Sequence, residues 1–347
     1  MLKVGVIGAG HISARHISGY KAAGCEVVAV ADVNIDNAKK CADEFGIKKV
    51  YSDYNELLKD DSIEAVSVAT PTFTHKDIVI DSLRSGKHVL CEKPPALNAD
   101  EVRECEKVAN ETGKLLMFGM VCRFHNTSEY LKKYIEAGRF GDFVSADCVR
   151  TVRCTGSGGW FASREKGGGP LRDECIHEID LVMYLMGYPK PKYVVANESF
   201  ANQELPARLN KIGWVSFDKT VYKSDIESSI EGFVLLDNGA SVRVKSSHLL
   251  NTLNPGRSIE LVGEKSGMML GTDGSFKMVE LVDDCYIEST PDLPSGPSFE
   301  YEVQHFVDCI VNGTECKVKP SEAVILMEII DALYKSAATK QPIVFQN

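Results

Sequence analysis

The segment formed by residues 2–32 constrains the fold of this chain more than any other stretch. It begins with a short apolar run, typical of a strand buried on both faces, which breaks at Gly8-Ala9-Gly10 before a helical segment. A second apolar run over residues 27–30 is followed by Asp32. Strand, glycine turn, helix, strand and terminal acid follow one another in the order of a dinucleotide-binding unit.

Each position of such a turn has a physical task. Gly8 makes the tight turn, and Gly10 lets the backbone approach a pyrophosphate at the positive N-terminus of the helix. We expect His11 and Ile12 to contact the same cofactor. Ser13 stands where a third glycine is usual, and its small side chain still permits helix–strand packing. The alternative is a purely structural glycine turn, because a G-x-G sequence alone is weak evidence.

The acid at the end of the second strand indicates which dinucleotide is bound. Asp32 is placed to bond the adenosine ribose hydroxyls, and its charge would repel a 2′-phosphate. Neither Val33 nor Asn34 supplies a positive charge that could receive such a phosphate. We therefore predict NAD rather than NADP as the cofactor.

Composition excludes several classes of partner. The 347 residues are enough for two domains, and a net charge of -10 argues against nucleic acid or an anionic membrane surface. No apolar segment approaches the ~20 residues that span a bilayer. The eleven cysteines are odd in number, contain no C-x-x-C and have no secretory signal before Val4, so we expect reduced thiols in a cytoplasmic protein.

Strands and helices alternate up to residue 122. We expect strands over residues 63–70, 87–95 and 115–121, and helices capped by Asp36, Asp53, Thr74 and Asn98. This alternation predicts a doubly wound parallel sheet, an α/β Rossmann domain over residues 1–122. Ligands bind at the carboxyl ends of such strands, so Thr70, Pro71, Glu92 and Lys93 are candidate cofactor-binding residues.

The pattern changes over residues 123–347. Long strand-like runs dominate, at residues 143–152, 193–200, 228–236 and 240–250, and the last two are joined by Asp237-Asn238-Gly239 as in a hairpin. Helices are expected over residues 127–137, 299–311 and 322–338. We predict an α+β domain with an open, mainly antiparallel sheet, whose C-terminal helix is able to pack back on the first domain.

Asp173 and His177 are four residues apart in a helical segment, so their side chains share one face. His177 could take a hydroxyl proton while Asp173 orients or charges its imidazole. The alternative is an aspartate that caps the helix beside a structural histidine.

Lys93 lies between Glu92 and Pro94 at the end of a buried strand. Beside a dinucleotide, its ammonium could bond a substrate hydroxyl and favour a developing alkoxide. The alternative is a structural salt bridge to Glu92.

Other candidates have fewer arguments behind them. Arg123 follows the last strand of the first domain and could face the nicotinamide end of the cofactor or the substrate, or belong to a helix start. Trp160 could wall a pocket or simply pack. We expect no metal, since acids around His177 lack a second histidine or cysteine set with ligand spacing.

The turn GAGHIS, the EKP triplet at residues 92–94 and the segment GGGPLRDECIHEIDL at 167–181 together resemble the Gfo/Idh/MocA oxidoreductase family, which includes inositol and sugar dehydrogenases. The resemblance covers nearly the whole chain. It implies that Lys93, Asp173 and His177 form the catalytic group and that Asp180 contacts substrate. It also implies homodimers or homotetramers that pair through the open C-terminal sheet. Cys175 and Arg172 depart from the usual pattern, which puts the identity of the substrate in doubt.

We therefore predict an NAD-dependent oxidoreductase that moves hydride between a secondary alcohol of a sugar, cyclitol or glycoside and nicotinamide. A first alternative is a redox glycosidase or sugar–sugar oxidoreductase that retains its NAD. A second alternative is a non-catalytic NAD-binding regulator on the same fold. Lys93, Asp173 and His177 speak against the regulator.

Overall fold

The computed structural model describes residues 1–153, 159–203, 224–271 and 275–346. The chain forms two compact units, one of Met1–His125 with Gly296–Val324 and one of Asn126–Ser295 with Ile325–Asn347. The expected boundary at residue 122 lies close to the first change of unit. In addition, the segment 296–324, which the sequence prediction assigned to the second domain, belongs to the first unit.

The first unit, whose residues are all described, contains a six-stranded sheet in the order β3-β2-β1-β4-β5-β6. Its strands are β1 (Lys3–Ile7), β2 (Glu26–Ala31), β3 (Lys49–Tyr51), β4 (Ala65–Val68), β5 (His88–Cys91) and β6 (Leu116–Phe118). All neighbouring pairs are parallel, which confirms the doubly wound sheet. The strand order reverses between β1 and β4, so their carboxyl ends form the switch point at which such sheets bind ligands.

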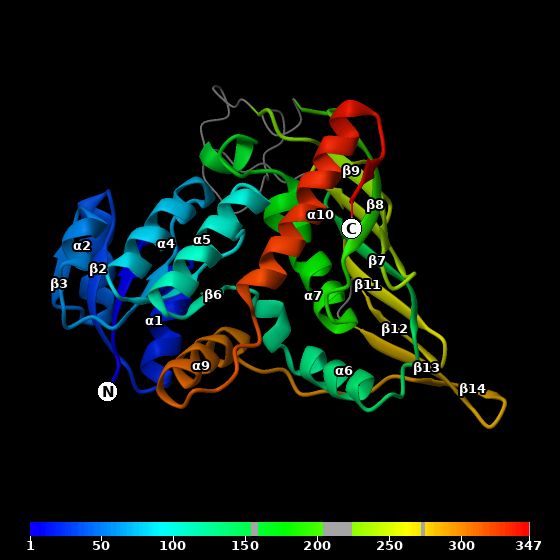
Figure 1. The fold of residues 1–347 in the computed structure, drawn as a ribbon, viewed down its shortest axis with the longest axis horizontal. Coiled ribbons are helices and arrows are strands. Elements are labelled where there is room, and N and C mark those ends of the chain that lie inside the picture. Colours follow the sequence, from blue (N-terminus) through cyan, green and yellow to red (C-terminus); the bar gives the residue numbers. More distant parts are fainter. Residues whose placement is uncertain (154–158, 204–223, 272–274, 347) are drawn as a thin grey trace. The chain divides into compact units, whose positions relative to one another are not determined.

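Helices cover this sheet. They are α1 (Ser13–Ala22), α2 (Ile35–Phe45), α3 (Tyr54–Leu58), α4 (His75–Arg84), α5 (Ala99–Thr112) and α9 (Ser298–Val311), with the 3-10 turns η1 (Thr72–Thr74) and η2 (Val121–Phe124). Helices α1 and α9 approach closely because α1 carries Gly19, where an added Cβ would lie 2.8 Å from the Cβ of Val303. Tyr20 and Phe306 meet edge to face beside this contact. Figure 1 shows α9, from late in the sequence, beside the early helix α1.

The structure confirms two of the expected helix caps and corrects two. Asp53 and Asn98 accept hydrogen bonds from backbone N–H groups of α3 and α5, as predicted. Helix α2 is capped by Asn34 rather than Asp36, because Asn34 has the extended backbone a cap requires and Asp36 lies inside the helix. Thr74 makes no cap, since its hydroxyl is used by Thr70 and the Pro71 carbonyl.

The described residues of the second unit form a nine-stranded sheet in the order β14-β13-β12-β11-β7-β10-β9-β8-β15. Its strands are β7 (Phe143–Thr151), β8 (Pro191–Ser199), β9 (Ser229–Leu236), β10 (Ser241–Ser247), β11 (Gly256–Gly263), β12 (Ser266–Leu270), β13 (Phe276–Val282), β14 (Cys285–Ser289) and β15 (Ile343–Val344). The expected hairpin joins β9 to β10, and Gly239 has a φ of 88° in its turn. Among the described strands of this second sheet, only β7 and β10 pair in parallel, so the sheet is mixed and mainly antiparallel.

One face of this sheet is covered by helical segments. They are α6 (Asn126–Glu136), the π-helical η4 (Pro170–Cys175), α7 (Ile176–Met186) and the part of α10 (Pro320–Thr339) beyond Val324, and the same unit contains the 3-10 turn η3 (Gly159–Ala162). Helix α7 packs on β7 and β11, and η4 packs on β7, β9 and β10. Gly232 in β9 lets α10 approach, because an added Cβ would lie 2.3 Å from Leu333. Figure 1 shows α7 along this face.

Two further features concern the expected environment. In the part of the chain that the structure describes, no helix is long and apolar enough to cross a membrane. The ten cysteines within the described ranges are all free thiols, and seven of them are buried.

Candidate active site

The two glycines of the first turn are required for different reasons. Gly8 has a φ of 96°, and an added Cβ would lie 2.4 Å from the carbonyl oxygen of Ala69, so the fold itself excludes a side chain there. An added Cβ at Gly10 would meet no atom within 4 Å. The space above Gly10 is therefore open to a ligand, as the predicted pyrophosphate contact requires.

The start of α1 suits an anion. Its N-cap residue Ile12 makes no side-chain capping hydrogen bond, and the first turn contains no acidic residue. The first N–H groups of the helix and the positive end of its dipole are thus available to a phosphate. Ser13 is buried, and its hydroxyl donates to the Gly10 carbonyl at 2.6 Å, which fixes the turn onto the helix. His11 is exposed beside this turn.

Asp32 follows β2 and holds the turn through its carboxylate. One oxygen accepts the N–H of Ala9 at 2.8 Å, and the other accepts the N–H of Asn34 at 2.8 Å. A carboxylate has about four acceptor positions, so ribose hydroxyls can still be bound. The residues present therefore fit a dinucleotide without a 2′-phosphate.

The loop after β4 is fixed by a histidine that sequence reasoning missed. Thr70 and Pro71 follow the strand, and the Thr70 carbonyl lies 2.8 Å from Nε2 of His75. The other ring nitrogen of His75 lies 2.8 Å from the carbonyl of Pro94. Burial lowers the pKa of His75, although both carbonyls favour the charged ring. This ring links the loop after β4 to the loop after β5, where Lys93 lies.

Glu92 belongs to a buried network that sequence reasoning also missed. Its Oε1 accepts Nε2–H of His16 at 2.8 Å, because a carboxylate can only accept. The other nitrogen of His16 lies 2.9 Å from the hydroxyl of Ser67, which in turn contacts the Tyr20 hydroxyl at 2.9 Å. Burial acts to raise the pKa of Glu92, but the hydrogen bond from His16, the nearby His16 and Lys93 side chains and the bond from the Lys93 N–H together lower it.

The network holds the backbone of Lys93. The second carboxylate oxygen of Glu92 accepts the Lys93 N–H at 3.1 Å. Lys93 itself is half-buried. Glu92 is thus joined to the backbone of Lys93 and to His16 of α1, and His16 in turn meets Ser67 of β4.

Asp173 and His177 lie on either side of a junction between two helix types. Asp173 is in η4 and is buried, with 7% of its surface exposed. His177 lies at the start of α7 and is half-buried. The chain turns with the wide spacing of a π helix through Cys175 and then with α spacing. Single π turns of this kind are frequent at functional sites.

A buried ionic cluster supports the start of η4. Glu227 is fully buried and accepts from the Tyr334 hydroxyl at 2.8 Å, the Leu171 N–H at 3.3 Å and Arg164 at 3.1 Å. Burial raises the pKa of Glu227 despite the positive charge of Arg164. Gly169, with a φ of 118°, brings the backbone so close that an added Cβ would lie 2.9 Å from Glu227. This cluster fixes the segment that carries Asp173.

The remaining candidates contact other residues of their own unit. Asp180, which is buried, accepts from the Tyr188 hydroxyl at 2.5 Å. Trp160 stacks on Phe161 with ring centroids 3.8 Å apart. Arg123 is fully buried and donates to the Lys317 carbonyl at 2.7 Å and to Glu322 at 2.5 Å. These bonds tie two segments of the first unit together, and a role of Arg123 in substrate binding stays a prediction.

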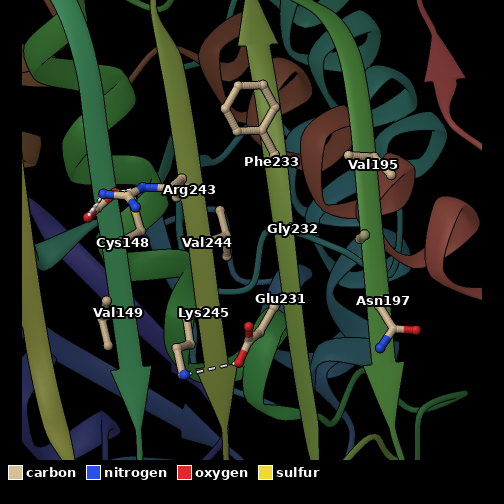
Figure 2. A pocket seen from close by; sticks show the side chains of 12 residues that line it. Cys148, Val149, Val195, Asn197, Glu231, Gly232, Phe233, Arg243, Val244 and Lys245 are labelled. Carbon is tan, nitrogen blue, oxygen red and sulfur yellow. Dashed lines mark hydrogen bonds and ion pairs between the residues drawn. The ribbon is translucent and has the colours of Figure 1, made fainter.

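One hollow lies on the uncovered face of the second sheet. It has a volume of about 530 Å³ and is lined by residues of β7, β8, β9 and β10. Figure 2 shows Phe233 and Val195 on this face, and the ion pair of Lys245 with Glu231 beside them. No titratable residue predicted for catalysis lines it.

Comparison with known proteins places these features in a family. The model of the Gfo/Idh/MocA oxidoreductase family with an NAD-binding Rossmann fold matches residues 2–120, and its C-terminal alpha/beta domain matches residues 132–345. The chain is 29% identical to D-glucoside 3-dehydrogenase of Escherichia coli (strain K12), over 97% of this chain and 96% of that protein.

Two further comparisons agree. The chain is 33% identical to trans-1,2-dihydrobenzene-1,2-diol dehydrogenase of Mus musculus, over 98% of each protein. The structure of levoglucosan dehydrogenase in complex with NADH and levoglucosan shares the fold, with a TM-score of 0.86, 21% identity and 100% of both chains covered. The chain thus belongs to the Gfo/Idh/MocA family of oxidoreductases and has an NAD-binding Rossmann domain at its N-terminus.

Proposed function

We propose that this protein is an NAD-dependent dehydrogenase that transfers hydride between a secondary alcohol of a sugar, cyclitol or glycoside and the nicotinamide. The observation that carries the proposal is Lys93 at the carboxyl end of β5, with its backbone held by an ionised Glu92, in a sheet whose switch point fits NAD. The names of relatives that match over the whole chain, a glucoside 3-dehydrogenase among them, support this substrate class.

Three residues are proposed to do the chemistry. His177 takes the hydroxyl proton during oxidation and returns it during reduction. Asp173 orients the imidazole and stabilises its charged form. The ammonium of Lys93 bonds the reacting hydroxyl and stabilises the developing alkoxide. Bound NAD supplies the hydride acceptor.

The local surroundings support these roles. Glu92 accepts hydrogen bonds from Nε2–H of His16 and from the backbone N–H of Lys93, so the loop that carries Lys93 is held by a buried carboxylate. Asp173 is carried by a segment that the Glu227 cluster fixes. A fixed segment keeps a positioning carboxylate in one geometry, which catalysis requires.

A substrate screen tests the proposal. Purified protein is mixed with polyols, sugars and glycosides, with and without added NAD, and NADH is followed by its absorbance. Appearance of NADH only with added NAD supports a dehydrogenase that releases its cofactor. Turnover without added NAD supports the alternative in which the cofactor is retained. Tight NAD binding with no turnover of any compound in either direction would contradict an enzymatic role. It would favour the alternative of a non-catalytic NAD-binding regulator.

We further propose a cytoplasmic homodimer or homotetramer that associates through the uncovered face of the second sheet. Apolar side chains are exposed there, among them Val195, Phe233, Val262 and Met269, each more than a third accessible. Exposed apolar side chains that gather on one face of a sheet commonly mark an interface between proteins. The free thiols of the described residues support a reducing compartment.

A further inference from the structure

Three potential metal ligands meet at the end of α9 in the first unit. His305 and Cys309 are four residues apart in the helix and share one face, and Cys316 returns to them from the loop that follows. Their ligand atoms all lie within 4.8 Å of one another. His305 is buried, and the two cysteines are half-buried.

The spacing of these atoms is close to that of a tetrahedral zinc site. Zn–S and Zn–N bonds of about 2.3 Å and 2.0–2.1 Å imply S···N separations of about 3.6 Å and S···S separations of about 3.8 Å. The Sγ of Cys309 lies 3.5 Å from Nε2 of His305. One edge of the tetrahedron therefore exists already, and the remaining edges require a movement of ~1 Å at most.

The loop that carries Cys316 is held in place by bonds that do not involve its thiol. The N–H of Lys317 donates to Nε2 of His305 at 3.0 Å, so this nitrogen is the one that carries a lone pair. The Lys317 carbonyl accepts from Arg123 at 2.7 Å. The N–H of Thr314 bonds back to the Asp308 carbonyl on α9. Such preorganisation lowers the entropy lost when a ligand binds.

We propose that His305, Cys309 and Cys316 bind one zinc ion, or a similar thiophilic divalent cation, with solvent in the fourth position. Two thiolates and a neutral imidazole cancel the charge of the ion, so the half-buried site stays neutral overall. The Lys317 N–H, displaced from Nε2 by the ion, then lies next to the thiolates and can donate to one of them. This proposal revises the expectation from sequence that no metal is bound.

Binding must release protons. Burial raises the pKa of Cys309 to about 12 and also raises the pKa of Cys316, so both thiols are protonated at neutral pH without the ion. The charged groups around them are Asp308 on α9, Arg123 on η2, Lys317 and Lys319 in the loop, and Glu322 on α10. The thiol protons are therefore released to solvent when the ion binds.

The test uses the full-length protein, reduced and stripped with a chelator. Zinc is titrated in competition with a chromophoric indicator, and Co²⁺ is titrated separately while the thiolate-to-cobalt charge-transfer band is followed. We expect one tightly bound ion per chain and a charge-transfer band that saturates at one equivalent. Cys316→Ser and Cys309→Ser should each weaken zinc binding by at least ~100-fold, since removing a direct ligand costs more than removing its outer-shell support.

Cys285→Ser is the matched control, because Cys285 is an exposed thiol on β14 in the other unit. It should leave affinity, stoichiometry and band unchanged. Equal binding by wild type and Cys316→Ser, or the absence of a thiolate-to-cobalt charge-transfer band in the wild type, would overturn the proposal. The cobalt titration of the wild type needs no variant, so it decides the matter even if a substitution impairs folding. The zinc and cobalt titrations do not measure sugar turnover. Their results therefore do not depend on whether the proposed dehydrogenase activity is found.

Discussion

At the scale of single residues, Gly8 and Gly10 are glycines for two different physical reasons. Gly8 is excluded from carrying a side chain by a backbone carbonyl 2.4 Å from the position of its Cβ, in a left-handed conformation. Gly10 has open space and needs no positive φ. The first glycine therefore serves the fold, and the second serves the ligand.

Gly8→Ala should consequently lower the stability of the protein, whereas Gly10→Ala should lower its affinity for NAD. Gly8→Ala should destabilise the protein by ~2 kcal/mol or more, since both backbone strain and a clash arise. Gly10→Ala should change the free energy of unfolding by under ~1 kcal/mol yet weaken NAD binding clearly. Urea unfolding and fluorescence titration with NAD measure the two quantities. Unchanged NAD affinity in Gly10→Ala would contradict the pyrophosphate contact.

The proton-transfer role of His177 should be separable from cofactor binding. General base catalysis contributes ~10² to 10⁴ in rate, so His177→Ala should reduce turnover by that order while NAD affinity stays nearly intact. Asp173→Asn keeps the shape and removes the charge, and it should alter the limb of the pH–rate profile that belongs to the base. If both variants retain full activity, the mechanism is wrong and the helix-cap interpretation of Asp173 is favoured.

At the scale of elements, α7 carries the proposed base His177 and, next to it in the chain, the buried acid Glu178. Glu178 is 1% exposed and pairs with Arg257 of β11 at 2.9 Å. Burial raises its pKa to about 7, although Arg257 and Arg150 oppose this. The helix therefore packs on the sheet partly through a group that titrates near neutral pH.

Glu178 should make stability depend on pH in a defined direction. The folded protein keeps the proton that the unfolded chain releases near its ordinary pKa of 4.5, so this contribution to stability is present below about pH 4.5 and is lost as pH rises toward about 7. The slope in this window is at most about 1.4 kcal/mol per pH unit. Glu178→Gln should flatten it, as measured by urea unfolding at several pH values. Glu231→Gln, an exposed acid on β9, should not.

At the scale of the whole molecule, the second sheet has one face covered by helices and one face bare. The covered face is packed by α7, η4 and part of α10. The bare face mixes apolar side chains with ion pairs such as Arg243–Asp147. A mixed surface with an apolar centre is typical of an interface between subunits.

Phe233→Glu should therefore break the association of subunits. Phe233 lies on β9 at the hollow of the bare face, and a buried charge in an interface is costly when it has no partner. Light scattering after size exclusion should show a dimer or tetramer for the wild type and a smaller species for the variant. Leu253→Glu, at an exposed residue outside the described strands, is the control. A monomeric wild type would contradict the proposed assembly.

Local sequence determined the first unit to a large extent. The alternation of strands and helices and the caps of α3 and α5 are local signals, and the structure confirms them. Gly46 and Gly113 end α2 and α5 in the left-handed conformation, which is also a local property of glycine. The turn from Gly8 to Gly10 and the acid at Asp32 could be recognised because every part of that motif lies within one short segment. In the second unit, strand-like runs in the sequence indicated β7, β8, β9 and β10, but they could not show that β7 and β10 pair in parallel.

Tertiary structure alone decided which distant residues meet. His16 reaches Glu92 across 76 positions, Glu227 reaches Tyr334 across 107, and Arg123 reaches Glu322 across 199. No local pattern encodes such pairs, because burial and partnering depend on how elements pack. Cys316 becomes a neighbour of His305 and Cys309 for the same reason: a helix places two ligands on one face, but only the path of the following loop brings back the third.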